Sequence, residues 1–329
     1  MSMTTARARL PKPRGTLSER VFQAAREPAQ EARSTGYLDV EPDSADDAAI
    51  TLWALYELSY RGFEDVDDAA EWDLDLLRVR RRLEADLEAQ LRARWPGVPA
   101  YDGDGGAAFE EAFFRWVEEF EGPSLSRFVQ RQATTEQVLD LLRLKSVYHL
   151  KESDPAAFVV PRLEVEARAG LMELQYDEYG GGRPDRLHAG LFARGMAAVG
   201  LRPDEGAYVD EAPTLVLEQN NAMSLFGLHR RLRGAAMGHL AAFEATSSLP
   251  CRRMAQGMER LGMAAEMIDY YTEHVEADAV HEQLAVRNIC APMIAVDPAV
   301  EADIWFGAFT CLDQEARLAG QLLEQWEAA

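Results

Sequence analysis

Hydrophobic positions recur at helical spacing in almost every segment of the chain. No segment of useful length shows the alternation of apolar and polar residues that is typical of a half-buried strand. Residues 45–62 form an amphipathic pattern, and residues 73–95 form a charged helical pattern that ends before Pro96. Further helices are predicted at about 107–121, 134–152, 161–179, 185–199, 211–248, 251–262, 263–292 and 298–327. Glycine and proline separate most of these segments, notably at residues 180–184. The pattern predicts an all-α bundle.

The same pattern divides the chain into three predicted parts. Residues 1–15 are basic and lack the apolar segment of a secretory signal, so a disordered tail on a cytoplasmic protein is expected. Residues 16–130 are predicted to form a helical extension or cap, and residues 131–329 the main bundle. A chain of 329 residues is long enough to bury a core of this size.

Charge and cysteine content narrow the classes of function. The chain has 34 basic against 56 acidic residues, a net charge of -22, which repels phosphate backbones and anionic membranes. We therefore expect neither a nucleic acid nor a membrane as a partner, and no apolar stretch has the length of a membrane span. Three cysteines at wide spacings argue against a disulfide framework or a cysteine-based zinc site.

One predicted helix carries a compact set of metal-ligand residues, His274-x3-Asp278-x2-His281. At about 100° per residue the three side chains fall within a stripe roughly 60° wide. Two imidazoles and a carboxylate suit iron, manganese or zinc, and do not suit calcium, which prefers oxygen alone. The alternative is a solvated helix face with two incidental histidines. The helix continues into the apolar run LAVRNICAPMIA, which favours a buried stripe.

Other predicted helices offer carboxylates and a further histidine. Glu178 and His188 would lie about 15 Å apart in one unbroken helix, but the Gly180–Gly182 break can bring them together. The alternative is an ordinary helix end with a partly buried His188. Glu244 lies on an otherwise apolar face, as a solvated edge residue or a paired buried charge. His239, about 140° away from it, is a weaker ligand candidate.

With its spacing, this constellation resembles the haem-oxygenase-like di-iron oxidases and oxygenases, the iron-containing redox enzymes. The phrases LKESDPAAFVVPRL, QYDEYGGGR and AFEATSSLP are also similar to that family's, and the likeness covers about residues 130–327. The resemblance implies a haem-oxygenase-like bundle of about seven core helices without haem. It also implies two Fe(II) ions and O2 as a co-substrate. The implied ligands are Glu178, His188, Glu244, His274, Asp278 and His281.

The long Glu178–His188 spacing is similar to that of the family's N-oxygenase branch. In that branch an additional upstream glutamate can join the metal site. Glu152 occupies the matching place and is a candidate seventh ligand, the alternative being a carboxylate on the surface at a helix end. Glu244 is the predicted bridge between the irons because a bidentate carboxylate neutralises both, and Asp278 is the predicted mobile ligand.

The resemblance implies O2-dependent oxidation of a small molecule in a biosynthetic pathway. Candidate reactions are N-oxygenation of an amine or amino-acid-derived substrate, and C–H oxidation or desaturation. An external electron donor is implied, and the habits of the fold suggest a homodimer. Two alternatives stay open: a non-catalytic helical metal-binding or interaction protein, and an Fe/Mn oxidase that modifies its own tyrosine. Tyr270 and Tyr271 are among the residues predicted to line a pocket.

Overall fold

The structure is a computed structural model that describes residues 7–27, 36–102 and 105–327, with only the backbone described at 105–107 and 276–279. Across these residues the chain forms helices, turns and loops, and no strand. The predicted all-α class is therefore confirmed. The chain divides into two compact units. The N-terminal unit comprises residues 1–94, 143–148 and 204–224, and the bundle unit comprises residues 95–142, 149–203 and 225–329.

The N-terminal unit is built on three helices that pack on one another, together with the first part of a fourth. They are α1 (Thr16–Arg26), α2 (Ala45–Glu57), α3 (Leu74–Arg94) and α10 (Thr214–Leu228). A buried carboxylate ties two of them, because Asp47 of α2 accepts hydrogen bonds from the backbone N–H groups of Leu17 and Ser18. These groups belong to the first turn of α1, where helix N–H donors have no partner within the helix.

Residues 7–15 lead into α1, and the structure gives them defined contacts. The backbone N–H of Leu10 donates to Asp65, and that of Lys12 donates to Asp210. The Arg14 guanidinium donates to the carbonyl oxygens of Val209 and Ala212. Residues 1–6, the start of the predicted disordered tail, lie outside the described residues. The division at residues 15 and 130 stays a prediction.

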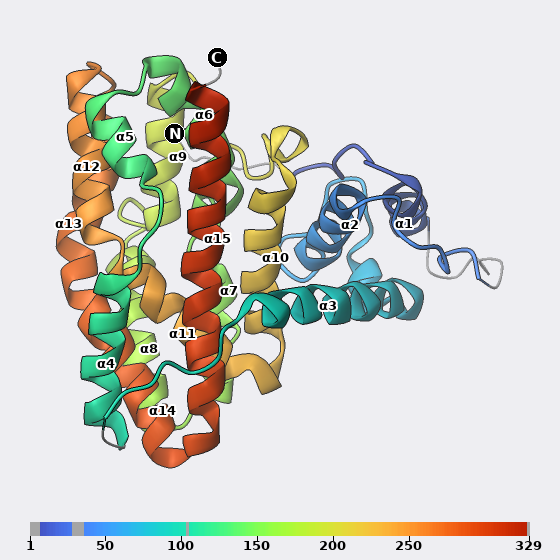
Figure 1. The fold of residues 1–329 in the computed structure, drawn as a ribbon. Helices are drawn as coiled ribbons and strands as arrows, with labels where there is room; N and C mark the ends of the chain where they lie inside the picture. The colour runs from blue at the N-terminus through green and yellow to red at the C-terminus, as the bar shows by residue number, and fades with distance from the viewer. Residues whose placement is uncertain (1–6, 28–35, 103–104, 328–329) are drawn as a thin grey trace. The chain divides into compact units, whose positions relative to one another are not determined.

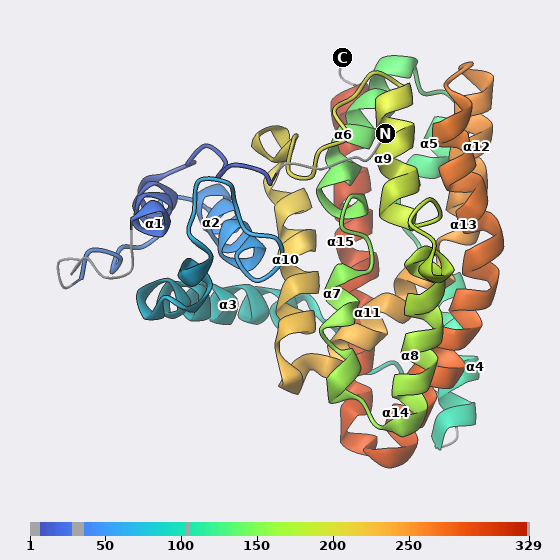
Figure 2. The same cartoon turned by 180° about the vertical axis from the view of Figure 1, so that it is seen from behind.

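The bundle unit holds most of the longer helices (Figures 1 and 2). They are α4 (Gly105–Glu119), α5 (Leu125–Arg131), α7 (Asp154–Ala157), α8 (Val165–Glu178), α9 (His188–Ala198), α11 (Arg233–Ala245), α12 (Ser248–Arg260), α13 (Ala265–Gln283), α14 (Ala291–Val296) and α15 (Glu301–Glu327). Helix α6 (Thr135–His149) belongs partly to each unit, as α10 does. Short 3₁₀ segments occur at Asp68–Trp72, Val160–Arg162, Gly180–Gly182, Val209–Glu211, Arg230–Leu232 and Pro298–Val300.

Helix α13 is packed against α9, α11 and α12, and α12 and α13 lie side by side in both views (Figures 1 and 2). Directly after α13 the backbone forms a π-helical segment, Leu284–Cys290, which packs against α8. No helix within the described ranges is long and apolar enough to cross a membrane.

Several helix boundaries differ from the prediction, and two of these differences have a clear physical reason. The single helix predicted over 211–248 is two helices, because His229 takes an extended conformation between α10 and α11. The Arg162 guanidinium donates to the carbonyl oxygen of Gly227 and thereby caps the end of α10. The helical run predicted to end at Pro292 continues through α14 to Val296. Pro292 lies in the first turn of α14, directly after the π-helical segment that ends at Cys290.

Helices α11 and α15 cross with their backbones in contact. A Cβ atom at Gly238 would lie 1.9 Å from the carbonyl oxygen of Ile304, and one at Gly307 would lie 1.9 Å from that of Ala235. Only glycine at both positions allows the two backbones to touch. Since α11 also carries Glu244, this crossing sets how deep that carboxylate lies.

Replacing either crossing glycine should separate α11 from α15. We expect Gly238→Ala and Gly307→Ala each to lower the free energy of unfolding by about 2–3 kcal/mol through overpacking. Gly320→Ala is the matched control on α15, because its Cβ would meet Pro123 at an ordinary 3.9 Å. That control should be neutral or stabilising by about 0.5–1 kcal/mol. Urea unfolding followed by circular dichroism measures all three, and equal effects would contradict the close contact.

Candidate metal centre

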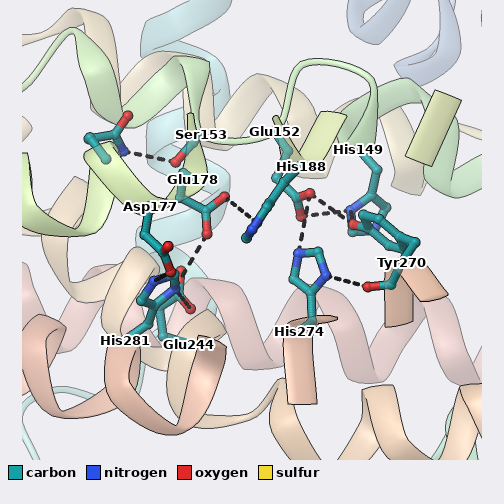
Figure 3. Close-up of polar contacts among 11 residues, drawn as sticks. His149, Glu152, Ser153, Asp177, Glu178, His188, Glu244, Tyr270, His274 and His281 are labelled. Atoms are coloured by element: carbon teal, nitrogen blue, oxygen red, sulfur yellow. Dashed lines mark hydrogen bonds and ion pairs between the residues drawn. The ribbon is translucent and has the colours of Figure 1, made fainter. Parts of the chain in front are cut away.

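Six buried side chains from separate parts of the bundle unit converge in two groups of three (Figure 3). Each is at most 7% exposed. Glu152 follows α6, Glu178 ends α8, His188 begins α9, Glu244 lies in α11, and His274 and His281 both lie in α13. Six of the seven residues predicted as ligands from the sequence are therefore brought together, including the upstream Glu152.

The first group consists of Glu152, His188 and His274, and its ligand atoms lie within 4.8 Å of one another. His274 Nε2 is 3.6 Å from Glu152 Oε2. The rings of His188 and His274 lie with centroids 4.5 Å apart and are tilted by 58° to each other. This group offers two imidazoles and one carboxylate.

The second group consists of Glu178, Glu244 and His281, within the same 4.8 Å limit. His281 Nδ1 lies 3.3 Å from Glu178 Oε1 and 3.5 Å from Glu244 Oε2. This group offers two carboxylates and one imidazole.

Glu178 connects the two groups. Its Oε1 faces His281 of the second group, while its Oε2 lies 3.2 Å from Nδ1 of His188 in the first. The two oxygens of one carboxylate thus point to different groups, as Figure 3 shows.

The glycine break explains how Glu178 and His188 meet. Helix α8 ends at Glu178, and Gly180, Gly181 and Gly182 follow with φ values of 71°, 62° and 77°. This left-handed conformation favours glycine and ends α8, so that the chain loops out before α9 begins. In a continuous helix Glu178 and His188 would lie about 15 Å apart. The break instead brings their side chains into contact.

The distances between donor atoms fit metal ligation better than hydrogen bonding. Two donors that each lie about 2.1 Å from one cation, at angles of about 90–110°, are about 3.0–3.4 Å apart. Two of the contacts within and between the groups, at 3.2 and 3.3 Å, are of this size, and the other two, at 3.5 and 3.6 Å, are slightly longer. His188 Nδ1 is buried and makes no hydrogen bond among the described residues. Leaving such an atom without a hydrogen bond is costly, and a bound cation would remove that cost.

The electrostatics of the groups also fit a cation. Burial raises the pKa of Glu244; His281 opposes this shift, and the charge of Glu178 adds to it. Burial would likewise raise the pKa of Glu152, but His149 and His274 outweigh it and hold that pKa well below the usual range. Several carboxylates close together in a core are unfavourable unless positive charge compensates them.

Hydrogen bonds fix the orientation of both α13 histidines. His274 Nδ1 lies 2.7 Å from the carbonyl oxygen of Tyr270, and His281 Nε2 lies 2.9 Å from Asp177 Oδ2. The opposite nitrogens, Nε2 of His274 and Nδ1 of His281, face the groups. Metal-binding histidines are held in this way by a carbonyl or carboxylate on the far nitrogen.

Sequence reasoning did not identify three outer partners. His149 and Tyr270 contact Glu152, and Asp177 contacts His281. Tyr270 was predicted only as a pocket residue. Two local signals point to such partners: His149 precedes Glu152 by three residues, and Tyr270 precedes His274 by four, both spacings that share a helix face.

Two further candidate ligands, Asp278 and His239, have different outcomes. Asp278 lies in α13, but its side chain is outside the described residues, so its role stays a prediction. His239, the weaker candidate, belongs to neither group. It is buried in α11 near Phe226, and burial lowers its pKa to about 4.

Comparison with known proteins places the chain in a family. Residues 139–316, more than half of the chain, match the iron-containing redox enzymes. These residues include all six converging side chains. The chain belongs to this family, and its all-α fold is the haem-oxygenase-like bundle expected from the sequence.

One curated relative is also similar. The chain is 28% identical over 145 residues to nitrosourea synthase from Streptomyces achromogenes subsp. streptozoticus. The alignment covers 44% of this chain and 31% of that protein, so the chain spans less than a third of its relative's length.

The turn between α8 and α9 can be tested through metal affinity. A Cβ at Gly180 would lie 2.6 Å from backbone atoms of Arg186 and Leu187, so Gly180→Ala must displace the start of α9 and His188. Gly182→Ala is the matched control, because it has the same positive φ with nothing within 4 Å. We expect Gly180→Ala alone to weaken Fe(II) binding by about tenfold or more, measured by anaerobic equilibrium dialysis. Equal losses in the two variants would show that the clash is unimportant.

The buried His239 predicts a pH dependence of stability. Its folded pKa of about 4 is below the value of 6.5 for an accessible histidine. The unfolded chain therefore binds an extra proton as pH falls from 6.5 to 4, and stability is lost across that window. The loss due to His239 should approach about 3 kcal/mol. Urea unfolding of metal-free parent and His239→Gln should show a shallower decline in the variant, and parallel declines would be inconsistent with a neutral buried ring.

Proposed function

We propose that this protein is a non-haem di-iron enzyme that uses O2 to oxidise a small molecule. The observation that carries the proposal is the pair of buried three-residue donor groups joined by Glu178. One group with three donors suits one ion, so two groups suit two ions. Membership of the iron-containing redox enzymes favours iron.

The contacts favour Glu178 as the carboxylate shared between the ions. Its oxygens face one group each, whereas the contact that Glu244 makes within the centre is with His281 of its own group. This differs from the sequence-based choice of Glu244 as the bridge. We infer that Glu244 completes the second group and that Glu178 connects the two.

The donor set supports redox chemistry with O2. Imidazole and carboxylate ligands suit iron, and three or four protein donors to each ion leave positions open. Two ferrous ions bound there would supply the electrons that reduce O2. The chain's own residues hold the ions, offset much of their charge through three carboxylates, and orient the histidines through Tyr270 and Asp177. Burial of all six donors keeps bulk water from the centre.

We propose N-oxygenation of an amine or amino-acid-derived molecule as the reaction. Two observations support this choice: similarity to a protein named as a nitrosourea synthase, and the presence of Glu152 in the first group. An external electron donor would return the irons to the ferrous state, and a homodimer is the proposed assembly. C–H oxidation or desaturation is the alternative outcome of the same centre.

Metal loading followed by exposure to O2 tests the proposal. We expect anaerobic loading to give two irons per chain by plasma mass spectrometry. Stopped-flow mixing with O2 should then give a transient visible absorbance. Iron without O2 consumption would indicate a non-catalytic metal-binding protein. Preferential manganese retention, or a mass increase on the protein's own tyrosine, would indicate a self-modifying oxidase instead.

The shared role of Glu178 predicts an asymmetry between two glutamates. Glu178→Ala should weaken both Fe(II)-binding steps, by about tenfold or more each, because its oxygens face both groups. Glu244→Ala should weaken one step only. Glu173→Ala is the control, since Glu173 is exposed on the same helix as Glu178. Anaerobic Fe(II) titration measures each step, and identical profiles for the two buried variants would exclude Glu178 as the shared ligand.

A further inference from the structure

Glu152 differs from the other five converging residues because it lies in a turn rather than in a helix. It follows the end of α6 at His149 and precedes α7, which begins at Asp154. Its neighbour Ser153 has φ 71°, and among the described residues no other residue besides glycine has a positive φ. That conformation is unfavourable for a residue with a Cβ and persists only where surrounding contacts impose it.

Contacts around the turn supply such a constraint. Gln175 of α8 donates from Nε2 to Ser153 Oγ at 2.8 Å, and both side chains are buried at 4% exposure. Strained turns of this kind cluster at functional sites. Here the strained residue directly follows Glu152, whose carboxylate is directed into the first group (Figure 3).

Two side chains hold both oxygens of that carboxylate. Tyr270 Oη donates to Glu152 Oε2 at 2.8 Å, and His149 Nδ1 lies 2.9 Å from Glu152 Oε1. His149 Nδ1 is also 2.9 Å from Tyr270 Oη, which closes a ring of three side chains. Because the tyrosine proton goes to Glu152, the arrangement is satisfied when Nδ1 of His149 carries its proton and donates to both oxygens.

Tyr270 also contacts a second donor of the same group. Its backbone carbonyl oxygen holds Nδ1 of His274 at 2.7 Å, which turns Nε2 of His274 toward Glu152 Oε2 at 3.6 Å. One residue thus orients two of the three donors, Glu152 through its hydroxyl and His274 through its carbonyl. Tyr270 is fully enclosed, at 1% exposure.

We propose that His149 and Tyr270 are positioning residues that make Glu152 a fixed ligand of the first group and thereby set the iron affinity of that group. This inference rests on the proposed di-iron function. Without the hydrogen bonds from His149 and Tyr270, a carboxylate on a turn is free to rotate away from the ion. Their loss should therefore weaken binding of the ion held by Glu152, His188 and His274 and leave binding of the other ion unaffected.

The alternative is that Tyr270 only fills space, since its ring packs on Phe192 with centroids 4.9 Å apart. Tyr270→Phe separates the two roles because it keeps the ring and the backbone carbonyl and removes the hydroxyl. Tyr271→Phe is the matched control. Tyr271 is the next residue of α13 and is also buried, and its hydroxyl makes no hydrogen bond among the described residues.

The test measures both Fe(II)-binding steps by anaerobic titration of the full chain, without turnover. Tyr270→Phe should weaken one step by about tenfold, and Tyr271→Phe should weaken neither. His149→Leu should resemble Tyr270→Phe, while His149→Asn, whose amide N–H can replace Nδ1–H, should recover most of the affinity. The visible ligand-field spectrum of the Co(II)-loaded protein should change in Tyr270→Phe and not in Tyr271→Phe.

A double-mutant cycle shows whether Tyr270 acts through Glu152. Glu152→Ala should weaken the same step, and adding Tyr270→Phe to it should cause no further loss. Additive losses, or equal effects of Tyr270→Phe and Tyr271→Phe, would overturn the positioning role. Two irons bound with unchanged affinities in Tyr270→Phe would overturn it while leaving the proposed function intact. A parent chain that binds no iron would instead remove the proposed function, and the inference with it.

Discussion

The structure depends on the burial of three carboxylates among three imidazoles in the core of a helical bundle. Charged groups withdrawn from water are stable only if they are paired, hydrogen-bonded or bound to a cation. The hydrogen bonds to His274, His281 and Glu152 satisfy the outer atoms of the centre, and the inner atoms face one another at 3.2–3.6 Å. Two cations between them would supply the missing positive charge. The rest of the bundle unit can be understood as the scaffold that holds these six groups at that separation.

Rigid backbone contacts provide the scaffold. Glycines allow α11 to touch α15 at Gly238 and allow α9 to approach α13 at Gly195, where a Cβ would lie 2.9 Å from Met267. Gly170 does the same between α8 and the π-helical segment, at 2.8 Å from the carbonyl oxygen of Asn288. Each contact joins a helix that carries a donor to a neighbour. Within α13 the two histidines are seven residues apart, about 10 Å along the axis, which lets one helix serve both groups.

Much of the fold and of the candidate site could be predicted from the sequence. Helical periodicity gave the class, the glycine run indicated how Glu178 and His188 meet, and the family resemblance pointed to Glu152. The pairing of donors could not be predicted, because whether His188 groups with Glu152 and His274 or with Glu244 and His281 depends on how α8, α9 and α13 pack. For the same reason the sequence favoured Glu244 as the shared carboxylate, whereas the contacts favour Glu178. The break at His229 was missed because the arginine that caps α10 lies 65 residues away in sequence.

A crystal structure of the Fe(II)-loaded protein, with anomalous data collected at the iron edge, tests the central claim most directly. The account predicts two anomalous peaks in the bundle unit. One should lie among Glu152, His188 and His274, the other among Glu178, Glu244 and His281, with one oxygen of Glu178 bonded to each. A single peak, or two peaks that both lie on one side of Glu178, would contradict it.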